Sequence, residues 1–577
     1  MELTDILPKP CKHVSNEISP NTFNEYFSSI GAKVASTTSP TSNFTSNIQD
    51  SIHTFKFKSI NIDFVEKILY SLPKSSKNDV LDFDTKLLNA SSNIISPSLT
   101  FLINMSLQTG YCPKDWKLAQ VSPAYKGKGN ISEETNYRPL SVISHLAKIC
   151  EKSVQNQLLQ YLMSNKFISI DQFAYLKLHS TQMCLHRLID DILDNVNQKE
   201  KTALCFLDIR KCFDTINHDI LLHKLKKYGI RDLELKWFAS YLSERSQIVV
   251  HNGAKSDTAF LNIGVPQGTI LGPILFLIYV NDLSNVVRDG FINIFADDVV
   301  VYSSSSCIKT LQASMQNTMN DVFKWYQDNK LCLSIDKCST LVINNNIKNP
   351  IRDFKINIGN EPLLQVKSMK YLGVVIDDTL NWHEHISTIT KKFNIINARL
   401  RKLRNTTPLE LRVKLYNSIC TPVLDYASTV WGSFAQNVTN KIQRMEHIAA
   451  RTLSGNYDFI NVRGSTLMTQ LNMSSFQNRY KYFLSLLTYK AIHGLVPDHI
   501  VNNIIFSYEV SQRHLRSFNN MHLYKPKPTC ELFKKSFAFA GPSQWNILPL
   551  QLKESSSVGT FKHLYKTIYP LCHKDEL

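Results

Sequence analysis

Two adjacent aspartates, Asp297 and Asp298, interrupt the otherwise apolar segment NIFADDVVVYSS. β-Branched and aromatic residues on both sides predict two strands that meet at Ala296-Asp297-Asp298, the tip of a β-hairpin. In a single continuous strand one carboxylate would face an apolar layer, where an unpaired charge is costly. At a hairpin tip both can face one edge. An ordinary acidic turn and a divalent-cation site both fit this segment.

A third carboxylate, Asp208, ends an apolar strand predicted at residues 203–207. A strand-end carboxylate beside a hairpin-tip pair could hold two metal ions. In such a site one ion activates the attacking oxygen of a phosphoryl transfer, and the other stabilises the leaving group. Asp214 and Asp219 are competing candidates, although Asp219 is better placed to cap the helix that starts beside it.

The composition favours an intracellular protein with a polyanionic partner. Lys and Arg exceed Asp and Glu by 17, which is typical of nucleic-acid binding and also of a solvated basic surface. The 12 cysteines form no CxxC pair, so a zinc ribbon is not expected. No signal peptide is apparent, and the apolar run at 273–280 is too short to cross a bilayer. The C-terminal KDEL is interpreted as a coincidence, and residence in the nucleus, the cytoplasm or both is expected.

Changes in sequence pattern divide the chain into five regions. Residues 1–50, rich in Ser, Thr and Asn, are predicted to be a flexible linker, and 51–115 a helical extension. Strands and helices alternate over 116–378, which predicts an α+β domain. Residues 379–500 are predicted to be helical, and 501–577 to form an aromatic, irregular tail.

The segment from 386 to 403 predicts one amphipathic helix. Its apolar residues recur at intervals of three and four: Ile386, Ile389, Phe393, Ile396, Leu400 and Leu403. The other faces carry basic residues without an acid: Lys391, Lys392, Arg399, Arg401, Lys402 and Arg404. A solvated helix face and a face that follows a phosphate backbone both fit this pattern.

Several motifs occur in a specific order: FLDIRKCFD, GVPQGTILGPILFLIYVNDL, FADD, SIDKCSTLVI and KYLGVVID. Together they resemble the reverse transcriptase of non-LTR (LINE) retrotransposons, in its jockey-like form. Upstream, WKLAQVSPAYKGKGNISEETNYRPLSVIS resembles the fingers, and downstream TPVLDYASTVWG and FAFAGPSQWNILP resemble the thumb and tail. The resemblance implies an α+β right-hand polymerase: fingers and a ferredoxin-like palm, followed by a helical thumb and a C-terminal region.

The resemblance also implies roles for individual residues. Asp208, Asp297 and Asp298 match the catalytic triad, which with Ile209 would hold two Mg²⁺ ions, or Mn²⁺ in their place. Lys337 matches a lysine that protonates the leaving pyrophosphate, although an exposed turn lysine is nearly as good an interpretation.

Phe213, five residues after Asp208, matches the steric gate that occupies the space of a 2′-OH and so favours deoxynucleotides. The remaining implied contacts are nucleotide binding by Lys126, Arg138, Gln267 and Gly268, a primer grip at Tyr371, Leu372 and Gly373, and nucleic-acid backbone contacts by Lys391, Lys392, Arg399 and Lys402. Packing alone could also explain the primer-grip residues.

The implied activity is RNA-directed DNA polymerisation, in which a DNA primer on an RNA template is extended with dNTPs. A catalytically silent fragment that still binds RNA is the alternative. The family's endonuclease and CCHC knuckle are expected to be missing. No membrane association is expected, and protein partners are unknown.

Overall fold

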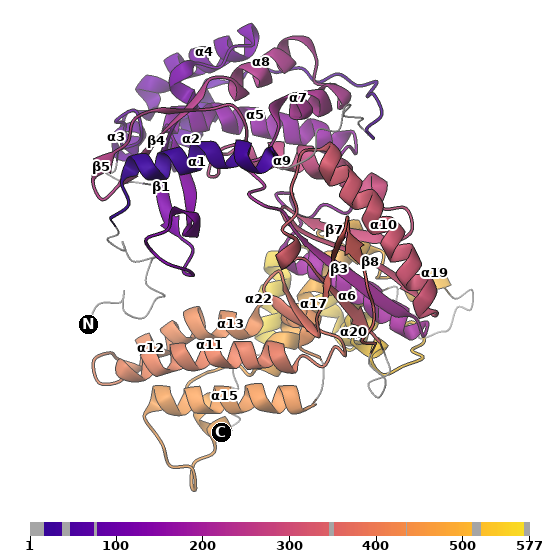
Figure 1. Cartoon of the computed structure of the whole chain (residues 1–577). Helices are drawn as coiled ribbons and strands as arrows, with labels where there is room; N and C mark the ends of the chain where they lie inside the picture. Colours follow the sequence, from indigo (N-terminus) through magenta and orange to yellow (C-terminus); the bar gives the residue numbers. More distant parts are fainter. Residues whose placement is uncertain are drawn as a thin grey trace.

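The computed structural model describes residues 17–36, 47–73, 78–344, 351–433, 436–510 and 521–569. Three groups of elements form three sides of a frame (Figure 1). The group containing β1 (Leu118–Tyr125) lies opposite the helices around α11 (His383–Lys402), and the sheet containing β3 (Lys201–Asp208) joins them at one side. This arrangement confirms the predicted right-hand fold. The group with β1 is the fingers, the sheet with β3 is the palm, and the helices around α11 are the thumb.

The palm is a five-stranded sheet in which β3 is the central strand and pairs antiparallel with both of its neighbours. One neighbour is β8, the second strand of the predicted hairpin. The strands, in spatial order, are β12 (Leu364–Gln365), β9 (Ser339–Ile343), β3, β8 (Asp298–Ser305) and β7 (Phe291–Phe295).

Both faces of the palm sheet are covered, because alternate residues of β3 enter two different cores. One core includes residues of α10 (Ile308–Asp328), and the other includes residues of α6 (Thr181–Asn197). Ala203, Cys205 and Leu207 belong to the first core, and Leu204 and Phe206 to the second. A strand buried on both faces reads as a continuous apolar run, which is why its polar end at Asp208 stands out in the sequence.

The fingers contain a second sheet, in which β1 pairs antiparallel with β2 (Tyr137–Ile143) and parallel with β4 (Arg245–His251). Its remaining strands are β5 (Ala254–Lys255) and β6 (Ala259–Leu261). The helices that pack in this part of the molecule include α2 (Ile62–Ser71), α3 (Thr85–Ala90), α4 (Ser92–Thr109), α5 (His145–Ser164), α7 (His218–Lys227) and α8 (Asp232–Leu242).

The prediction of a flexible linker over residues 1–50 is wrong for α1 (Pro20–Ala35), which is a helix docked on the fingers sheet (Figure 1). The Ser19 side chain accepts a hydrogen bond from the Thr22 amide and so caps this helix. Phe23 and Phe27 are buried in a small core with residues of β1, β2 and β4. The Ser- and Thr-rich residues that follow obscured this i, i+4 aromatic pair. Residues 1–16 and 37–46 lie outside the described part of the chain.

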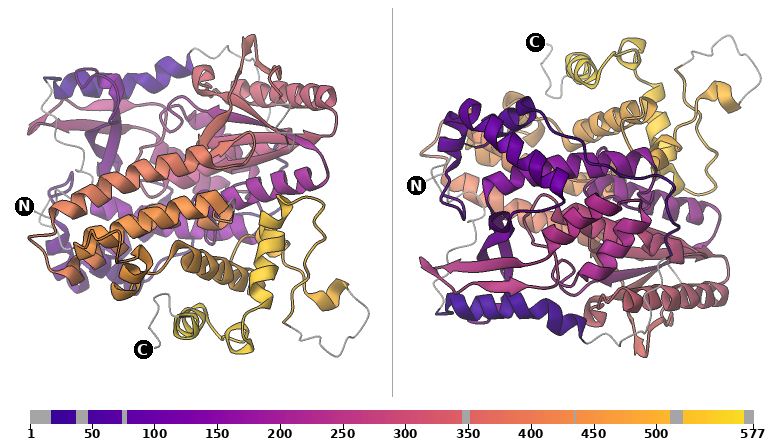
Figure 2. Two further views of the ribbon diagram at one scale, coloured as in Figure 1. Left: turned by 90° about the horizontal axis from the view of Figure 1, so that it is seen from below. Right: turned by 90° about the horizontal axis from the view of Figure 1, so that it is seen from above.

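The thumb consists of helices that lie side by side, as a second view of the molecule shows (Figure 2). The predicted apolar stripe faces α15 (Gln436–Ser454): Phe393 and Leu400 are buried in the same core as Ile442 and Ala449. The other thumb elements are α12 (Leu409–Leu415), η6 (Tyr416–Cys420), α13 (Thr421–Asp425), α14 (Ser428–Trp431), α16 (Gly464–Gln470) and α17 (Phe476–Ile492).

The prediction that residues 501–577 are irregular is wrong for the part from Phe537 to Ile568, which is mainly helical. Helices α20 (Phe537–Asn546) and α22 (Val558–Ile568) both contact α17. Trp545 and Phe561 are fully buried in a separate core there. The many aromatic residues of this region therefore serve packing. Residues 511–520 and 570–577, which include the KDEL sequence, lie outside the described residues.

Candidate active site

The three aspartates of the predicted triad meet at one end of the palm sheet. Asp208 is the last residue of β3 and pairs directly with Asp298, the first residue of β8. Ala296 and Asp297 form the turn between β7 and β8, which confirms the predicted hairpin. Ala296 adopts a left-handed backbone with φ of 55°, a conformation that costs a residue with a Cβ about 1 kcal/mol. The tight turn keeps both hairpin carboxylates at the exposed end.

The close approach of these carboxylates perturbs their ionisation. Burial, together with the negative charges of Asp297 and Asp208, raises the pKa of Asp298 to about 6. The Lys337 ammonium offsets part of this charge, since its Nζ lies 3.3 Å from Asp208 Oδ1. The site therefore attracts cations.

A divalent cation fits the chemistry of this donor set, although the protein supplies only part of a coordination shell. Among the described residues, no three His, Cys, Asp or Glu side chains lie close enough to enclose a metal ion by themselves. Mg²⁺ is commonly held by one or two carboxylates together with substrate phosphates. The end of the palm sheet thus suits an ion that arrives with, or is completed by, a phosphorylated substrate.

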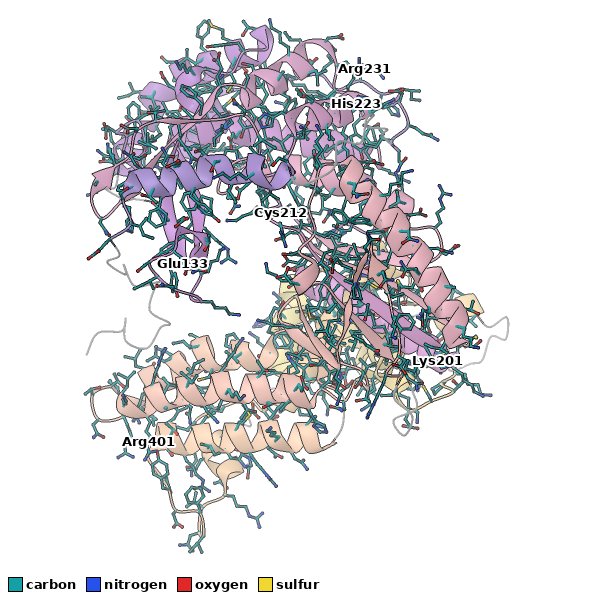
Figure 3. All side chains as sticks on the ribbon, in the orientation of Figure 1. Glu133, Lys201, Cys212, His223, Arg231 and Arg401 are labelled. Atoms are coloured by element: carbon teal, nitrogen blue, oxygen red, sulfur yellow. The ribbon has the colours of Figure 1, made fainter. Side chains whose placement is uncertain are left out.

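A pocket of about 550 Å³ opens beside the carboxylates. Four of the five predicted nucleotide contacts line it: Lys126, Arg138, Phe213 and Gln267. The other predicted site residues in its wall are Asp208, Asp297, Ile209 and Lys337. Figure 3 shows Cys212, another lining residue, on the side of the palm that faces the fingers.

Positive charge is concentrated in this pocket. Partial burial lowers the pKa of Lys126, and the nearby cations Lys211, Arg138 and Lys337 lower it further. The Lys126 ammonium is held by the Thr135 carbonyl, to which its Nζ donates over 2.6 Å. Cations that repel one another opposite a group of carboxylates favour a polyanion accompanied by metal ions, such as a triphosphate.

Phe213 lies in the pocket wall with its ring stacked on Phe276, at 4.8 Å between centroids. Its carbonyl accepts a hydrogen bond from the Val265 amide over 2.8 Å, which ties it to the loop at 264–268. Phe213 is only half-buried, so its ring can contact a bound molecule.

The loop at 264–268 approaches the fingers too closely for a side chain. The Ser141 amide donates to the Gln267 carbonyl over 2.8 Å. Gly268 has φ of 114°, and a Cβ there would lie 2.4 Å from the Ser141 carbonyl oxygen. Gln267 Nε2 donates to Asp214 Oδ1 over 3.3 Å. Asp214 is thus a partner of Gln267, and burial raises its pKa to about 6.

The sequence-based prediction missed the contribution of α1. Ile30 and Val34 form part of the pocket wall. Lys211 places its ammonium 5.2 Å from the centre of the Tyr26 ring, a cation–π contact between α1 and the pocket. The aromatic spacing in FNEYF could have identified the helix, but not its position against the palm.

Other predicted site residues lie outside this pocket. Tyr371 is buried, and its hydroxyl lies 3.4 Å from Cys184 Sγ, so for its side chain the packing interpretation holds. Leu372 and Gly373 form the turn between β13 (Ser368–Tyr371) and β14 (Val374–Asp377) and remain predictions for the primer grip.

On the thumb, Lys391, Lys392 and Lys402 are exposed on α11, and Arg399 is half-buried. Their contacts with a nucleic-acid backbone stay predictions. The suggestion that Asp219 caps α7 is wrong: Asn217 is the cap, and its Oδ1 accepts from the Ile220 amide.

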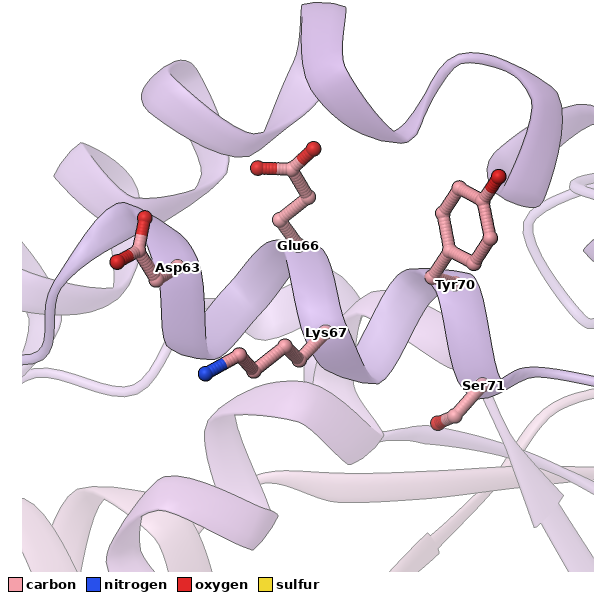
Figure 4. A pocket seen from close by; sticks show the side chains of 5 residues that line it. All are labelled: Asp63, Glu66, Lys67, Tyr70 and Ser71. Carbon is pink, nitrogen blue, oxygen red and sulfur yellow. The ribbon is translucent and has the colours of Figure 1, made fainter.

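A second pocket, of about 520 Å³, contains none of the predicted site residues (Figure 4). Helix α2 alone lines it, through Asp63, Glu66, Lys67, Tyr70 and Ser71. In the part of the chain that the structure describes, no helix combines the length and apolar character needed to cross a membrane.

Carboxylates at the end of a palm sheet, a cationic pocket and an aromatic side chain in its wall are the arrangement expected of a template-directed nucleotide polymerase. Residues 126–376 match the family described as reverse transcriptase (RNA-dependent DNA polymerase). Enzymes of this family use divalent metal ions.

The curated relatives specify the resemblance further. The chain is 29% identical over 408 residues to the RNA-directed DNA polymerase from mobile element jockey of Drosophila melanogaster, a match that covers 69% of this chain and 44% of the relative. The jockey polymerase of Drosophila funebris is also 29% identical, over 409 residues, with the same coverage of both chains.

The probable RNA-directed DNA polymerase from transposon BS of Drosophila melanogaster is 28% identical over 443 residues, 73% of this chain and 47% of the relative. The predicted resemblance to non-LTR retrotransposon reverse transcriptases is confirmed, and the chain spans less than half the length of these curated relatives.

Proposed function

We propose that this chain is an RNA-directed DNA polymerase, which extends a DNA primer with dNTPs on an RNA template. The observation that carries the proposal is the register between strands β3 and β8 of the palm sheet. It aligns Asp208 with Asp298 and sets Asp297 at the tip, beside a pocket lined with cations. The match to the reverse transcriptase family and the similarity to the jockey polymerases support the same reaction.

The carboxylates of Asp208, Asp297 and Asp298, with Ile209 beside them in the pocket wall, would hold two Mg²⁺ ions. When bound, these ions would activate the primer 3′-hydroxyl and neutralise charge on the triphosphate. Lys126 and Arg138 bind and orient the triphosphate from the fingers side. Catalysis of this kind rests mainly on positioning and on charge stabilisation.

The wall of the pocket determines which nucleotide fits. The Phe213 ring offers no hydrogen-bond partner to a 2′-hydroxyl and occupies its space, so deoxynucleotides are selected. Lys337 supplies a proton to the departing pyrophosphate. Its ammonium lines the same pocket and is held by Asp208.

Primer extension by the purified chain tests this proposal. A labelled DNA primer annealed to an RNA template is incubated with Mg²⁺ and dNTPs. Asp297→Asn should reduce extension by about 100-fold or more and leave template binding intact. Asp289→Asn is the matched control, since Asp289 is an exposed aspartate just before β7 and outside the pocket. Binding by the unaltered chain without any extension would refute the polymerase and favour a silent RNA-binding protein.

A further inference from the structure

The loop that follows α15, residues 455–463, projects from one end of the thumb (Figure 1). Two of its apolar side chains are exposed. We call this segment the thumb loop. Phe459 is 68% exposed and Ile460 is 93% exposed. Neither side chain lines the polymerase pocket. Large apolar side chains held in water at a projecting tip indicate a binding surface, provided that the loop holds them there.

Hydrogen bonds do hold the thumb loop in one shape. Asp458 Oδ1 accepts from the backbone amides of Ile460 and Asn461, over 3.0 and 2.9 Å. From α15, the Arg451 guanidinium donates to the carbonyls of Asp458 and Val462, over 2.9 and 2.6 Å. Phe459 and Ile460 are therefore presented by a preformed loop, and the binding of a partner would cost little ordering entropy.

Arginine side chains surround the aromatic rings of the loop. The Arg451 guanidinium lies 4.3 Å from the centre of the Phe459 ring. Arg401, in the last turn of α11, and Arg404, just after that helix, lie 5.6 and 5.9 Å from the centre of the Tyr457 ring. Figure 3 labels Arg401 at this end of the thumb. The surface thus combines flat rings with positive charge.

The positive charge continues along α15. Lys441 and Arg444 are exposed on this helix, whereas its Glu446 is buried and paired with Arg479 at 2.9 Å. The carboxylate of Asp458, the one acid within the thumb loop, is occupied by the loop's own amides. A partner for this surface must therefore be a polyanion that also offers apolar faces.

We propose that the thumb loop and the adjoining face of α15 bind a single-stranded stretch of nucleic acid outside the polymerase pocket. Unpaired bases would stack on Phe459, and the arginines and lysines would follow the phosphates. A protein partner fits less well, because two apolar side chains ringed by cations make a small apolar core for a protein interface. This site is independent of the proposed polymerase activity and needs neither dNTPs nor metal ions.

Fluorescence anisotropy tests the site on the full chain. The probe is a labelled 30-nucleotide single-stranded RNA of mixed sequence, and an excess of unlabelled primer–template duplex occupies the polymerase site. Phe459→Ala should weaken binding about ten-fold, and Phe459→Tyr should restore it, because stacking needs only a ring. Phe101→Ala is the matched control: Phe101 is 62% exposed but lies on α4 in the fingers.

A duplex RNA probe separates base stacking from backbone contact. Paired bases offer no free face, so Phe459→Ala should change duplex affinity less than two-fold. Unchanged single-strand affinity in Phe459→Ala would overturn the proposal, and so would an equal loss on the duplex. If Phe459→Ala lowers the melting temperature, Arg463→Glu replaces it as the test, since Arg463 is exposed and makes none of the loop hydrogen bonds described above. Arg463→Glu should likewise weaken single-strand binding, and an unchanged affinity of this variant for the single strand would overturn the proposal.

Discussion

Gly31→Ala should damage nucleotide binding, although it improves the helix in which it lies. Gly31 faces the palm in the last part of α1, where a Cβ would lie 2.0 Å from the carbonyl oxygen of Asp214. Real Cβ atoms stay beyond about 3.0 Å, so α1 or the segment after Phe213 must move by about 1 Å. Either movement displaces the wall formed by Ile30 and Val34.

The opposing effects can be weighed. Replacing a helical glycine by alanine stabilises a helix by about 1 kcal/mol. Forcing a methyl group into a closed contact costs about 1–3 kcal/mol. The free-energy cost of packing the methyl group thus equals or exceeds the free energy that the helix gains. A misplacement of about 1 Å in a catalytic pocket can also lower the rate about 100-fold. We therefore expect kcat/KM for dNTPs to fall about ten- to a hundred-fold.

The assay is steady-state primer extension with dNTP titration, with thermal unfolding measured alongside. Ala32→Gly is the matched control, because Ala32 is exposed on the same helix and its substitution removes helical preference without touching the pocket. This control should lower stability slightly and leave kcat/KM within about two-fold. Wild-type kinetics in Gly31→Ala would refute the role of α1 as a wall of the pocket.

Three further outcomes are expected. Phe213→Ala should raise ribonucleotide incorporation about ten-fold or more, because it opens the space of a 2′-hydroxyl, and unchanged discrimination would exclude Phe213 as the gate. Burial, aided by Lys392, lowers the pKa of His385 from 6.5 to about 4, so stability should fall by about 3 kcal/mol as the pH drops from 6.5 to 4. This loss should be smaller in His385→Gln, as measured by thermal unfolding across that range. Lys391→Ala combined with Lys392→Ala should reduce the salt dependence of template–primer binding by up to about two units of log–log slope, whereas an unchanged slope would place the duplex elsewhere.

Local pattern was enough to predict the palm hairpin. Apolar runs flank Ala296-Asp297-Asp298, and the turn forms where the polar residues interrupt them. The amphipathic stripe of α11 was also predicted correctly from local pattern, since Ile386, Phe393 and Leu400 are all buried. In both cases the signal comes from residues close together in sequence, and burial on one face determines the structure.

Contacts between distant segments could not be derived from local pattern. Nothing near Gly31 in the sequence indicates that it meets Asp214, because that contact depends on how α1 crosses the fingers sheet. Tyr371 was assigned by resemblance to the primer grip, yet its ring packs against Phe206 inside the core. A motif identifies the segment, and the three-dimensional structure determines which of its atoms reach the solvent.

Backbone hydrogen bonds hold together the chain segments that form the candidate active site. The Ser334 amide donates to the Asp208 carbonyl over 2.8 Å, which fixes the Lys337 turn beside the end of β3. In the same way, the Val265 amide bonds the Phe213 carbonyl and the Ser141 amide bonds the Gln267 carbonyl, which ties Phe213 to the loop at 264–268 and that loop to the fingers. Side-chain substitutions at Asp208, Phe213 or Gln267 leave these bonds in place, because none of the three side chains makes them. Loss of activity in such variants therefore reports on the chemistry of the side chain. Gly31→Ala differs, because it changes how closely α1 packs against the segment that contains Asp214.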